Sequence, residues 1–336
     1  MKRLILHIGF NKTGSTSIQT DLVLNADALQ AQGVLYPNDA SAPYMQRVQH
    51  LPLATAMSER RITWMAPKKR ATLDQAYPSL HAALKQQQFE TLLLSSESFG
   101  GLDMTPQNIS WIKDQFADYH TTILAYIRRQ DQYFLSRYQQ DIKNGGTNRF
   151  EFCAHTKRRQ LDFAHRLAPW RKIFGADRVI VRPFAPALWH EGVLLYDFLS
   201  ALGLEYRGLQ LSPPVNEGLD YRVVELLRRA NELELPQQCW LRLCRGLKDI
   251  MPADFSPRKM QLSSTDSETL RQYYRNSNIR ALEGSGIDVD LFFPAPDPGC
   301  AACLPPAELP EQLLFELVTA LAQPNILGSS DPENRQ

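Results

Sequence analysis

The chain has 336 residues, of which 43% are hydrophobic, and this is enough for a sizeable core in one large domain or two small ones. The 37 Lys and Arg residues nearly balance the 36 Asp and Glu residues, so the net charge of +1 gives no global reason to expect nucleic-acid or membrane binding. No apolar run approaches the ~18 residues of a membrane span, and the run after Arg3 is too short for a secretory signal. We therefore expect a cytoplasmic protein without a membrane span or a nucleic-acid partner.

Hydrophobic periodicity predicts strands that alternate with helices along the chain. Apolar runs predict strands at residues 3–9, 34–37, 91–95, 121–127 and 178–182. Helical spacing predicts helices at residues 17–32, around 50–60, and at 77–88, 130–143, 192–202, 221–233 and 267–283. Strands that are apolar throughout and separated by helices are typical of a parallel sheet covered on both faces. The predicted fold class is α/β, a P-loop-like three-layer sandwich whose central parallel sheet is flanked by helices, with a mainly helical C-terminal third.

Three polar clusters follow predicted strands at their carboxyl ends. They are the loop around Lys12, the run Ser96-Glu97-Ser98, and the pair Arg128-Arg129. In a parallel sheet the carboxyl ends of the strands share one edge, and ligands bind beyond that edge. We therefore expect these three clusters to form one site.

The loop after the first strand differs from a nucleoside-triphosphate loop at one decisive position. Gly9 and Gly14 have the separation of that motif, but Ser15 stands where its lysine belongs, and Lys12 lies inside the loop. A helix N-terminus with a lysine and hydroxyls still favours an anion. The carboxyl end of the strand at residues 91–95 carries serines and Glu97, so the aspartate that would hold magnesium is missing there. The alternative is a Gly/Ser turn that caps an ordinary helix.

This loop resembles the 5′-phosphosulfate loop of sulfotransferases that use 3′-phosphoadenosine-5′-phosphosulfate (PAPS). Their pattern Lys-x-Gly-Ser/Thr-Thr-Ser/Thr is matched by Lys12, Thr13, Gly14, Ser15, Thr16 and Ser17. Their second motif, an arginine followed eight positions later by a serine in a helix, is matched by Arg128 and Ser136. The resemblance is to the bacterial group that includes carbohydrate-modifying members, and it covers most of residues 1–184. It continues through Arg182-Pro183-Phe184 and residues 197–204 and is weaker beyond residue 205.

The resemblance implies PAPS as co-substrate, its desulfated form PAP as product, and no metal. It implies that Gly14 and the hydroxyls of residues 13 and 15–17 hold the 5′-phosphate and sulfate, and that Arg128 and Ser136 hold the 3′-phosphate. It also implies a single sulfotransferase domain over residues 1–323, with a cofactor-binding core over about 1–205 and a helical part over about 206–323. Residues 324–336 have the composition of a disordered tail.

Sulfuryl transfer requires a cation at the leaving oxygen and a base for the acceptor. Lys12 is the candidate cation, because an ammonium offsets the charge that develops as the S–O bond breaks. Glu97 is the first candidate for the base, since partial burial can raise a carboxylate pKa and several relatives use a glutamate at this strand end. His50 is the second candidate. The alternatives are a helix cap or ion pair for Glu97 and a packed or capping histidine for His50. His7, within a strand, is interpreted as a packed core residue.

The expected acceptor is a hydroxyl, with a glycan or glycolipid favoured. The basic stretch of Lys157-Arg158-Arg159, Arg166 and Arg171-Lys172 is either a solvated helical face or a site for an anion. The cysteine pair Cys300 and Cys303 has metal-ligand spacing, but a zinc site needs two further ligands, so free thiols are expected. Two other functions stay open: a P-loop phosphotransferase that binds a nucleotide with magnesium, and a PAP- or PAPS-binding protein without catalysis.

Overall fold

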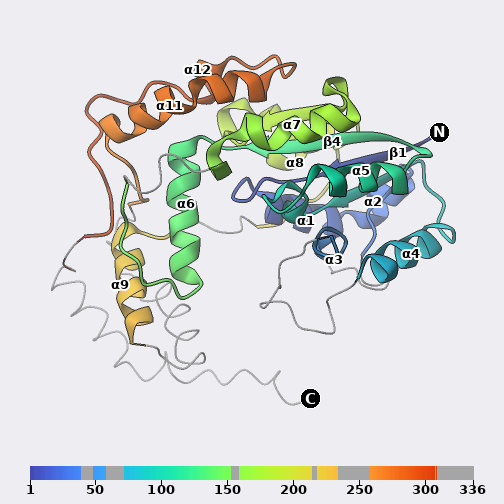
Figure 1. Ribbon diagram of the computed structural model, residues 1–336, viewed down its shortest axis with the longest axis horizontal. Helices are drawn as coiled ribbons and strands as arrows, with labels where there is room; N and C mark the ends of the chain where they lie inside the picture. Colours follow the sequence, from blue (N-terminus) through green and yellow to red (C-terminus); the bar gives the residue numbers. More distant parts are fainter. Residues whose placement is uncertain are drawn as a thin grey trace. The chain divides into compact units, whose positions relative to one another are not determined.

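The computed structural model describes residues 1–38, 48–57, 72–152, 159–213, 218–233, 258–306 and 308. Strands and helices alternate through the first two thirds of the chain (Figure 1). The strands are β1 (Lys2–His7), β2 (Val34–Leu35), β3 (Thr91–Ser95), β4 (Tyr119–Ile127) and β5 (Val179–Pro183). The α-helices of the described residues are α1 (Ser15–Leu24), α2 (Ala26–Ala31), α3 (Leu51–Thr55), α4 (Leu73–Leu84), α5 (Pro106–Gln115), α6 (Gln130–Lys143), α7 (Phe163–Phe174), α8 (Leu194–Ala201), α9 (Tyr221–Glu232), α11 (Ser264–Leu282) and α12 (Val289–Phe292). The 3-10 helices are η2 (Glu97–Gly100), η3 (Arg159–Leu161), η4 (Ala176–Arg178), η5 (Pro186–Leu188) and η6 (His190–Gly192).

The five strands form one parallel sheet in the order β2-β3-β1-β4-β5. His7, the last residue of β1, pairs with Ser95 of β3 and with Leu124 of β4. The segments that follow β1, β3 and β4 therefore leave the sheet at the same edge, side by side. The predicted α/β class, with a central parallel sheet flanked by helices, is confirmed.

Each face of the sheet is covered by helices. On one face α1, α2 and α8 bury a continuous apolar cluster, whose members include Ile5, Ile18, Leu22, Leu93, Leu124, Phe198 and Leu199. Successive side chains of a strand point to opposite faces. The other face packs against α7, which contacts β4 and β5 and also α5. Trp170 of α7 is 1% exposed, so α7 contributes to the core on this face of the sheet.

The local differences from the predicted elements have identifiable causes. The prediction of one continuous helix over residues 17–32 is wrong, because the structure has two helices, α1 and α2, separated at Asn25. The side-chain amide of Asn25 donates to the carbonyl oxygens of Asp21 and Gln210. Helix α5 was not predicted, although Thr105 caps it and Pro106 starts it, as expected for a helix N-terminus. Helix α7 was also not predicted, and it carries Pro169 in its interior, which interrupts the helical signal.

The described chain forms two compact units. The first unit comprises residues 1–130, 157–216 and 271–295 and contains the whole sheet, and the second comprises residues 131–156, 217–270 and 296–336. Helices α6 and α11 each begin in one unit and end in the other. The expected domain ranges stay a prediction, and the tail at 324–336 lies outside the described residues. Among the helices that the structure describes, none has the length and apolar character needed to cross a membrane.

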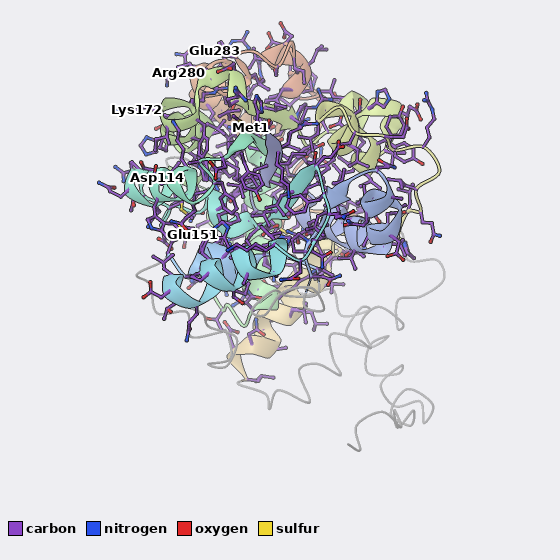
Figure 2. The ribbon with its side chains drawn as sticks, turned by 90° about the vertical axis from the view of Figure 1, so that its right-hand side faces the viewer. Met1, Asp114, Glu151, Lys172, Arg280 and Glu283 are labelled. Carbon is purple, nitrogen blue, oxygen red and sulfur yellow. The ribbon has the colours of Figure 1, made fainter. Side chains whose placement is uncertain are left out.

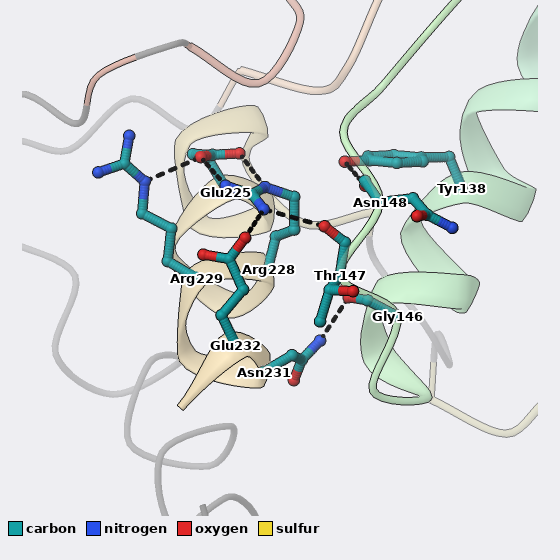
Figure 3. A network of polar contacts seen from close by, with 9 residues as sticks. All are labelled: Tyr138, Gly146, Thr147, Asn148, Glu225, Arg228, Arg229, Asn231 and Glu232. Carbon is teal, nitrogen blue, oxygen red and sulfur yellow. Dashed lines mark hydrogen bonds and ion pairs between the residues drawn. The ribbon is translucent and has the colours of Figure 1, made fainter. Parts of the chain in front are cut away.

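Helix α9 of the second unit carries an ionic network whose central pair, Arg228 and Glu225, is buried (Figure 3). Arg228 is 2% exposed and donates to both carboxylate oxygens of Glu225, to Glu232, and to the carbonyl oxygen of Thr147. Burial acts to raise the pKa of Glu225, but hydrogen bonds from Arg228 and Arg229 outweigh it and hold that pKa below its usual value. The network thus fastens the loop after α6 to α9.

Candidate active site

The three predicted polar clusters do gather at the carboxyl edge of the sheet. Lys12 follows β1, Glu97 follows β3, and Arg128 follows β4, and β1 is the strand between the other two. All three side chains are half-buried. This edge is where a parallel α/β sheet binds its ligands.

The loop between β1 and α1 has three residues with positive φ, Gly9, Lys12 and Gly14. Lys12 has a φ of 63° and Gly14 a φ of 77°. A Cβ at Gly14 would lie 2.5 Å from Cε2 of Phe184 and 2.6 Å from Cδ2 of Leu194, so this position requires glycine for space as well as for its backbone. Gly14 is also the N-cap of α1 and has no side-chain acceptor. The first-turn N–H groups are therefore the donors that a helix N-terminus offers to an anion.

The loop hydroxyls divide into two pairs. Thr13 is fully buried and Ser15 is 1% exposed, and both donate to the carbonyl oxygen of Phe10. Thr16 is exposed and Ser17 is half-buried, and both lie in the first turn of α1. The geometry gives Thr13 and Ser15 a role in bracing the loop and leaves Thr16 and Ser17 better placed to meet a ligand.

Glu97 starts the short helix η2, which packs tightly against the Lys12 loop. The N-cap of η2 is Ser96, whose hydroxyl accepts from the N–H of Ser98, so Glu97 does not serve as the cap. A Cβ on Gly9 would lie 3.1 Å from Cα of Glu97, and a Cβ on Gly100 would lie 2.4 Å from the carbonyl oxygen of Ile8. Two glycines therefore permit the close approach that sets Glu97 beside the loop.

His50, the other candidate base, is fully buried beneath this edge. Its Nε2 donates to the carbonyl oxygen of Pro37 at 2.7 Å, and its Nδ1 accepts from the N–H of Ser95 at 2.9 Å. Burial lowers the pKa of His50 to about 4, against the smaller opposing effect of its backbone hydrogen bonds. The ring is thus a neutral Nε2–H tautomer whose two nitrogens both hold backbone groups together.

His7 belongs to the same buried layer. Burial lowers its pKa to about 3, and its Nδ1 lies 2.8 Å from the hydroxyl of Ser95, which also accepts from Gln19. The ring of His7 packs edge-on against Phe198. This arrangement agrees with the interpretation of His7 as a packed core residue.

Arg128 is held directly against the Lys12 loop. Its Nη1 donates to the carbonyl oxygen of Lys12 at 3.0 Å, and its guanidinium lies 5.1 Å from the ring centre of Phe184. Arg129, its neighbour and competitor in the sequence, instead lies over the ring of Phe293 at 4.7 Å. The structure therefore places Arg128, and not Arg129, at the loop. Ser136 is half-buried on α6 within the second unit.

Three further residues contact the segments at this edge, and the sequence predicted none of these contacts. Phe184 packs on Gly14 and Arg128, Phe10 supplies the carbonyl that braces the loop, and Arg166 contacts the Phe10 ring at 3.6 Å. The N–H of Phe184 donates to the carbonyl oxygen of Ile127, and two residues earlier Arg182 forms an ion pair with the buried Asp197. Only long-range packing identifies these roles, because Phe10 and Phe184 look like ordinary core residues in the sequence and Arg166 looks like one member of a basic stretch.

The basic stretch divides between structural and solvated roles. Arg171 donates to the carbonyl oxygens of Arg280, Ala281 and Glu283 at the end of α11. Lys172 is exposed at the molecular surface (Figure 2). Lys157 and Arg158, like Cys153, Cys239 and Cys244, lie outside the described residues. Cys300 and Cys303 are free thiols, and among the described residues no three potential metal ligands gather.

The comparisons with known proteins do not assign a family to the chain. No family model matches it. An uncharacterised protein of Archaeoglobus fulgidus is 28% identical over 214 residues, which cover 59% of this chain and 57% of that protein. The match therefore spans little more than half the length of this relative. Among solved structures, a sulfotransferase from Alicyclobacillus acidocaldarius is similar at a TM-score of 0.44 and 14% identity, over 87% of this chain and 99% of that chain.

Proposed function

We propose that the protein is a PAPS-dependent sulfotransferase that moves a sulfuryl group to a hydroxyl, with a carbohydrate as the favoured acceptor. One observation carries the proposal: a left-handed loop with an internal lysine opens onto a helix N-terminus, beside Arg128 on one side and Glu97 on the other. Each group sits at the end of a neighbouring strand, as the resemblance to this enzyme class requires.

The donor set fits a doubly phosphorylated ligand. The first-turn N–H groups of α1 and the hydroxyls of Thr16 and Ser17 would hold the 5′-phosphate and sulfate. Arg128 would bind the 3′-phosphate, since guanidinium matches the fork geometry of phosphate, and the part of Ser136 in holding this phosphate stays a prediction. All of these groups are donors or cations, as an anionic ligand demands.

PAPS supplies an activated sulfuryl group when it is bound. The acceptor oxygen forms the new O–S bond, the bond from sulfur to the 5′-phosphate oxygen breaks, and the electron pair leaves with that oxygen. Lys12 stabilises this developing negative charge from within the loop. In the phosphoryl-transfer analogy, positioning and charge stabilisation do most of the work, and the loop provides both.

Glu97 is the proposed base that takes the acceptor's proton. It is partly accessible, lies against the loop, and leaves the capping of η2 to Ser96. His50 is disfavoured for this role, because its two ring nitrogens already hold backbone groups and protonation would break the bond from Ser95. We therefore assign His50 to the support of the strand end.

Ligand binding tests the proposal before any acceptor is known. PAP should raise the melting temperature, adenosine 5′-monophosphate should do so less because it lacks the 3′-phosphate, and ATP with magnesium should not match PAP. Arg128→Ala should remove the preference for PAP over the monophosphate, a loss of about 10- to 100-fold in affinity for a charge-assisted hydrogen bond. A larger shift with ATP and magnesium would favour a phosphotransferase, and no shift with PAP at saturation would refute the proposal.

Turnover and the acceptor are tested with sulfur-labelled PAPS and a panel of glycans, glycolipids and phenols. Transfer to a glycan would support the proposed acceptor class, and transfer only to phenols would overturn it. Binding of PAP without transfer to any member would favour a binding protein without catalysis.

A further inference from the structure

Arg166 on α7 contacts two segments of the candidate site, the Lys12 loop and the helix η2. Its guanidinium lies 3.6 Å from the ring centre of Phe10, which lies two residues before Lys12 in the same loop. Its Nη2 donates to the carbonyl oxygen of Gly100 at 2.8 Å, and Gly100 ends the helix η2 that Glu97 begins. Arg166 is buried, with 8% of the residue exposed. One buried side chain therefore joins the segment that carries the lysine to the segment that carries the base.

Phe10 transmits its position to the rest of the Lys12 loop. The ring is fully buried and stacks on Phe163, also of α7, with the ring centres 5.7 Å apart. Its carbonyl oxygen accepts from the hydroxyls of Thr13 and Ser15, which lie on either side of Gly14. A shift of Phe10 would therefore displace the part of the loop that holds Lys12 and leads into α1.

The N-terminus of α7, the helix that carries Arg166, is itself held by hydrogen bonds. Asp162 caps α7 by accepting from the N–H of His165, and the hydroxyl of Ser277 donates to the same carboxylate at 2.6 Å. The second guanidinium N–H group of Arg166, from Nη1, donates to the carbonyl oxygen of Gln160 at 2.9 Å. Arg166 thus projects from a fixed helix start with its planar group held in one orientation.

We propose that Arg166 is a positioning residue that sets the spacing between Lys12 and Glu97 during sulfuryl transfer, an inference that rests on the proposed function. A planar guanidinium can lie over the Phe10 ring while its in-plane N–H groups donate to Gly100 and Gln160, a fixed geometry that the compact ammonium of a lysine does not have. In-line displacement needs the base, the acceptor and the leaving oxygen aligned, and a displacement of about 1 Å costs on the order of 10²-fold in rate.

The test compares Arg166→Met and Arg166→Lys with Arg171→Met. Arg171 lies on the same helix and also donates to backbone carbonyl oxygens, but those belong to the end of α11. Hydrogen–deuterium exchange should become faster in residues 9–17 and 96–101 in both Arg166 variants, and not in Arg171→Met. Unchanged exchange in these two segments would overturn the proposal, and this readout needs neither cofactor nor acceptor.

Turnover separates positioning from general stability. Arg166→Met should lower kcat by on the order of 10²-fold with PAP still bound, and Arg166→Lys should not restore the rate. In a Glu97→Gln background, Arg166→Met should add little further loss, because Lys12 and the cofactor share one loop and only their alignment with Glu97 is disturbed. Additive losses, or a normal kcat in Arg166→Met, would overturn the positioning role alone. A wild-type protein that binds PAP but transfers nothing would instead refute the proposed function.

Discussion

Two groups of charged side chains in this protein are organised in opposite ways. On α9, Arg228 and Glu225 are almost fully buried, and carboxylates and a backbone carbonyl surround the guanidinium. At the sheet edge, Lys12, Glu97 and Arg128 stay half-buried at the ends of three strands, where a ligand can reach them. The first arrangement is closed and serves folding, whereas the second is open and can serve binding and chemistry.

This difference predicts which property a substitution in each group should change, stability or activity. Removing one partner of a closed network leaves a buried charge without compensation, and the folded state loses stability. Removing a charge from the half-buried edge is expected to cost the folded protein less and to remove an interaction with the ligand or the transition state. Stability and activity measured on matched variants therefore test whether the two groups of charges differ in this way.

Glu97→Gln is expected to have the largest effect on turnover. The amide keeps the shape of the side chain but cannot take the acceptor's proton, so kcat should fall by about 10²- to 10⁴-fold. PAP binding and the melting temperature should stay as in the wild type. Glu90→Gln is the matched control, because Glu90 is exposed and directly precedes the same strand, β3. Equal losses in the two variants would remove Glu97 from the mechanism.

Lys12→Met should come next, with a loss of about 10²- to 10³-fold in kcat, as for the removal of one donor at a developing charge. The control is Lys172→Met, which removes an exposed lysine at the end of α7 (Figure 2). A fall in stability that matches the fall in rate would show that Lys12 supports the loop and not the leaving oxygen.

The sequence predicted the sheet edge well because its signals are local. An apolar run and the residues after it identify each strand end, so Lys12, Glu97 and Arg128 could be placed at one edge before the fold was known. The hydrogen bonds from Thr13 and Ser15 to the carbonyl oxygen of Phe10 could not be predicted, because a hydroxyl in a glycine loop looks the same whether it meets a ligand or a backbone carbonyl. Arg166 belonged to a charge run, and only its distant contacts with Phe10 and Gly100 identify it.

Arg228→Met tests the closed network. It leaves the buried Glu225 without its main partner, so the free energy of unfolding should fall by about 3 to 5 kcal/mol. Arg229→Met is the matched control, because Arg229 bonds the same carboxylate from a side chain that is 39% exposed, against 3% for Arg228. That variant should lose at most about 1 kcal/mol, as exposed ion pairs do. Denaturant unfolding measures both, and equal losses would contradict the role of burial.

His50 shares a property with each of the two regions, since it is buried like the network on α9 but lies directly beneath the sheet edge. Its pKa is lowered from 6.5 to about 4 by burial, so the unfolded chain binds a proton more readily than the folded protein between these values. Stability is therefore complete above about pH 6.5 and falls by about 2 to 3 kcal/mol from this group as the pH drops toward 4. His7, whose pKa burial lowers to about 3, adds a loss of the same sign.

The decisive variant is His50→Gln, compared with His165→Gln at an exposed position. Unfolding free energies measured across this pH range should depend less steeply on pH in His50→Gln and be unchanged in their slope in His165→Gln. His50→Gln should also be less stable at neutral pH, because an amide cannot reproduce both backbone hydrogen bonds of the ring. Its kcat should stay close to that of the wild type, and a loss as large as that of Glu97→Gln would make His50 the base.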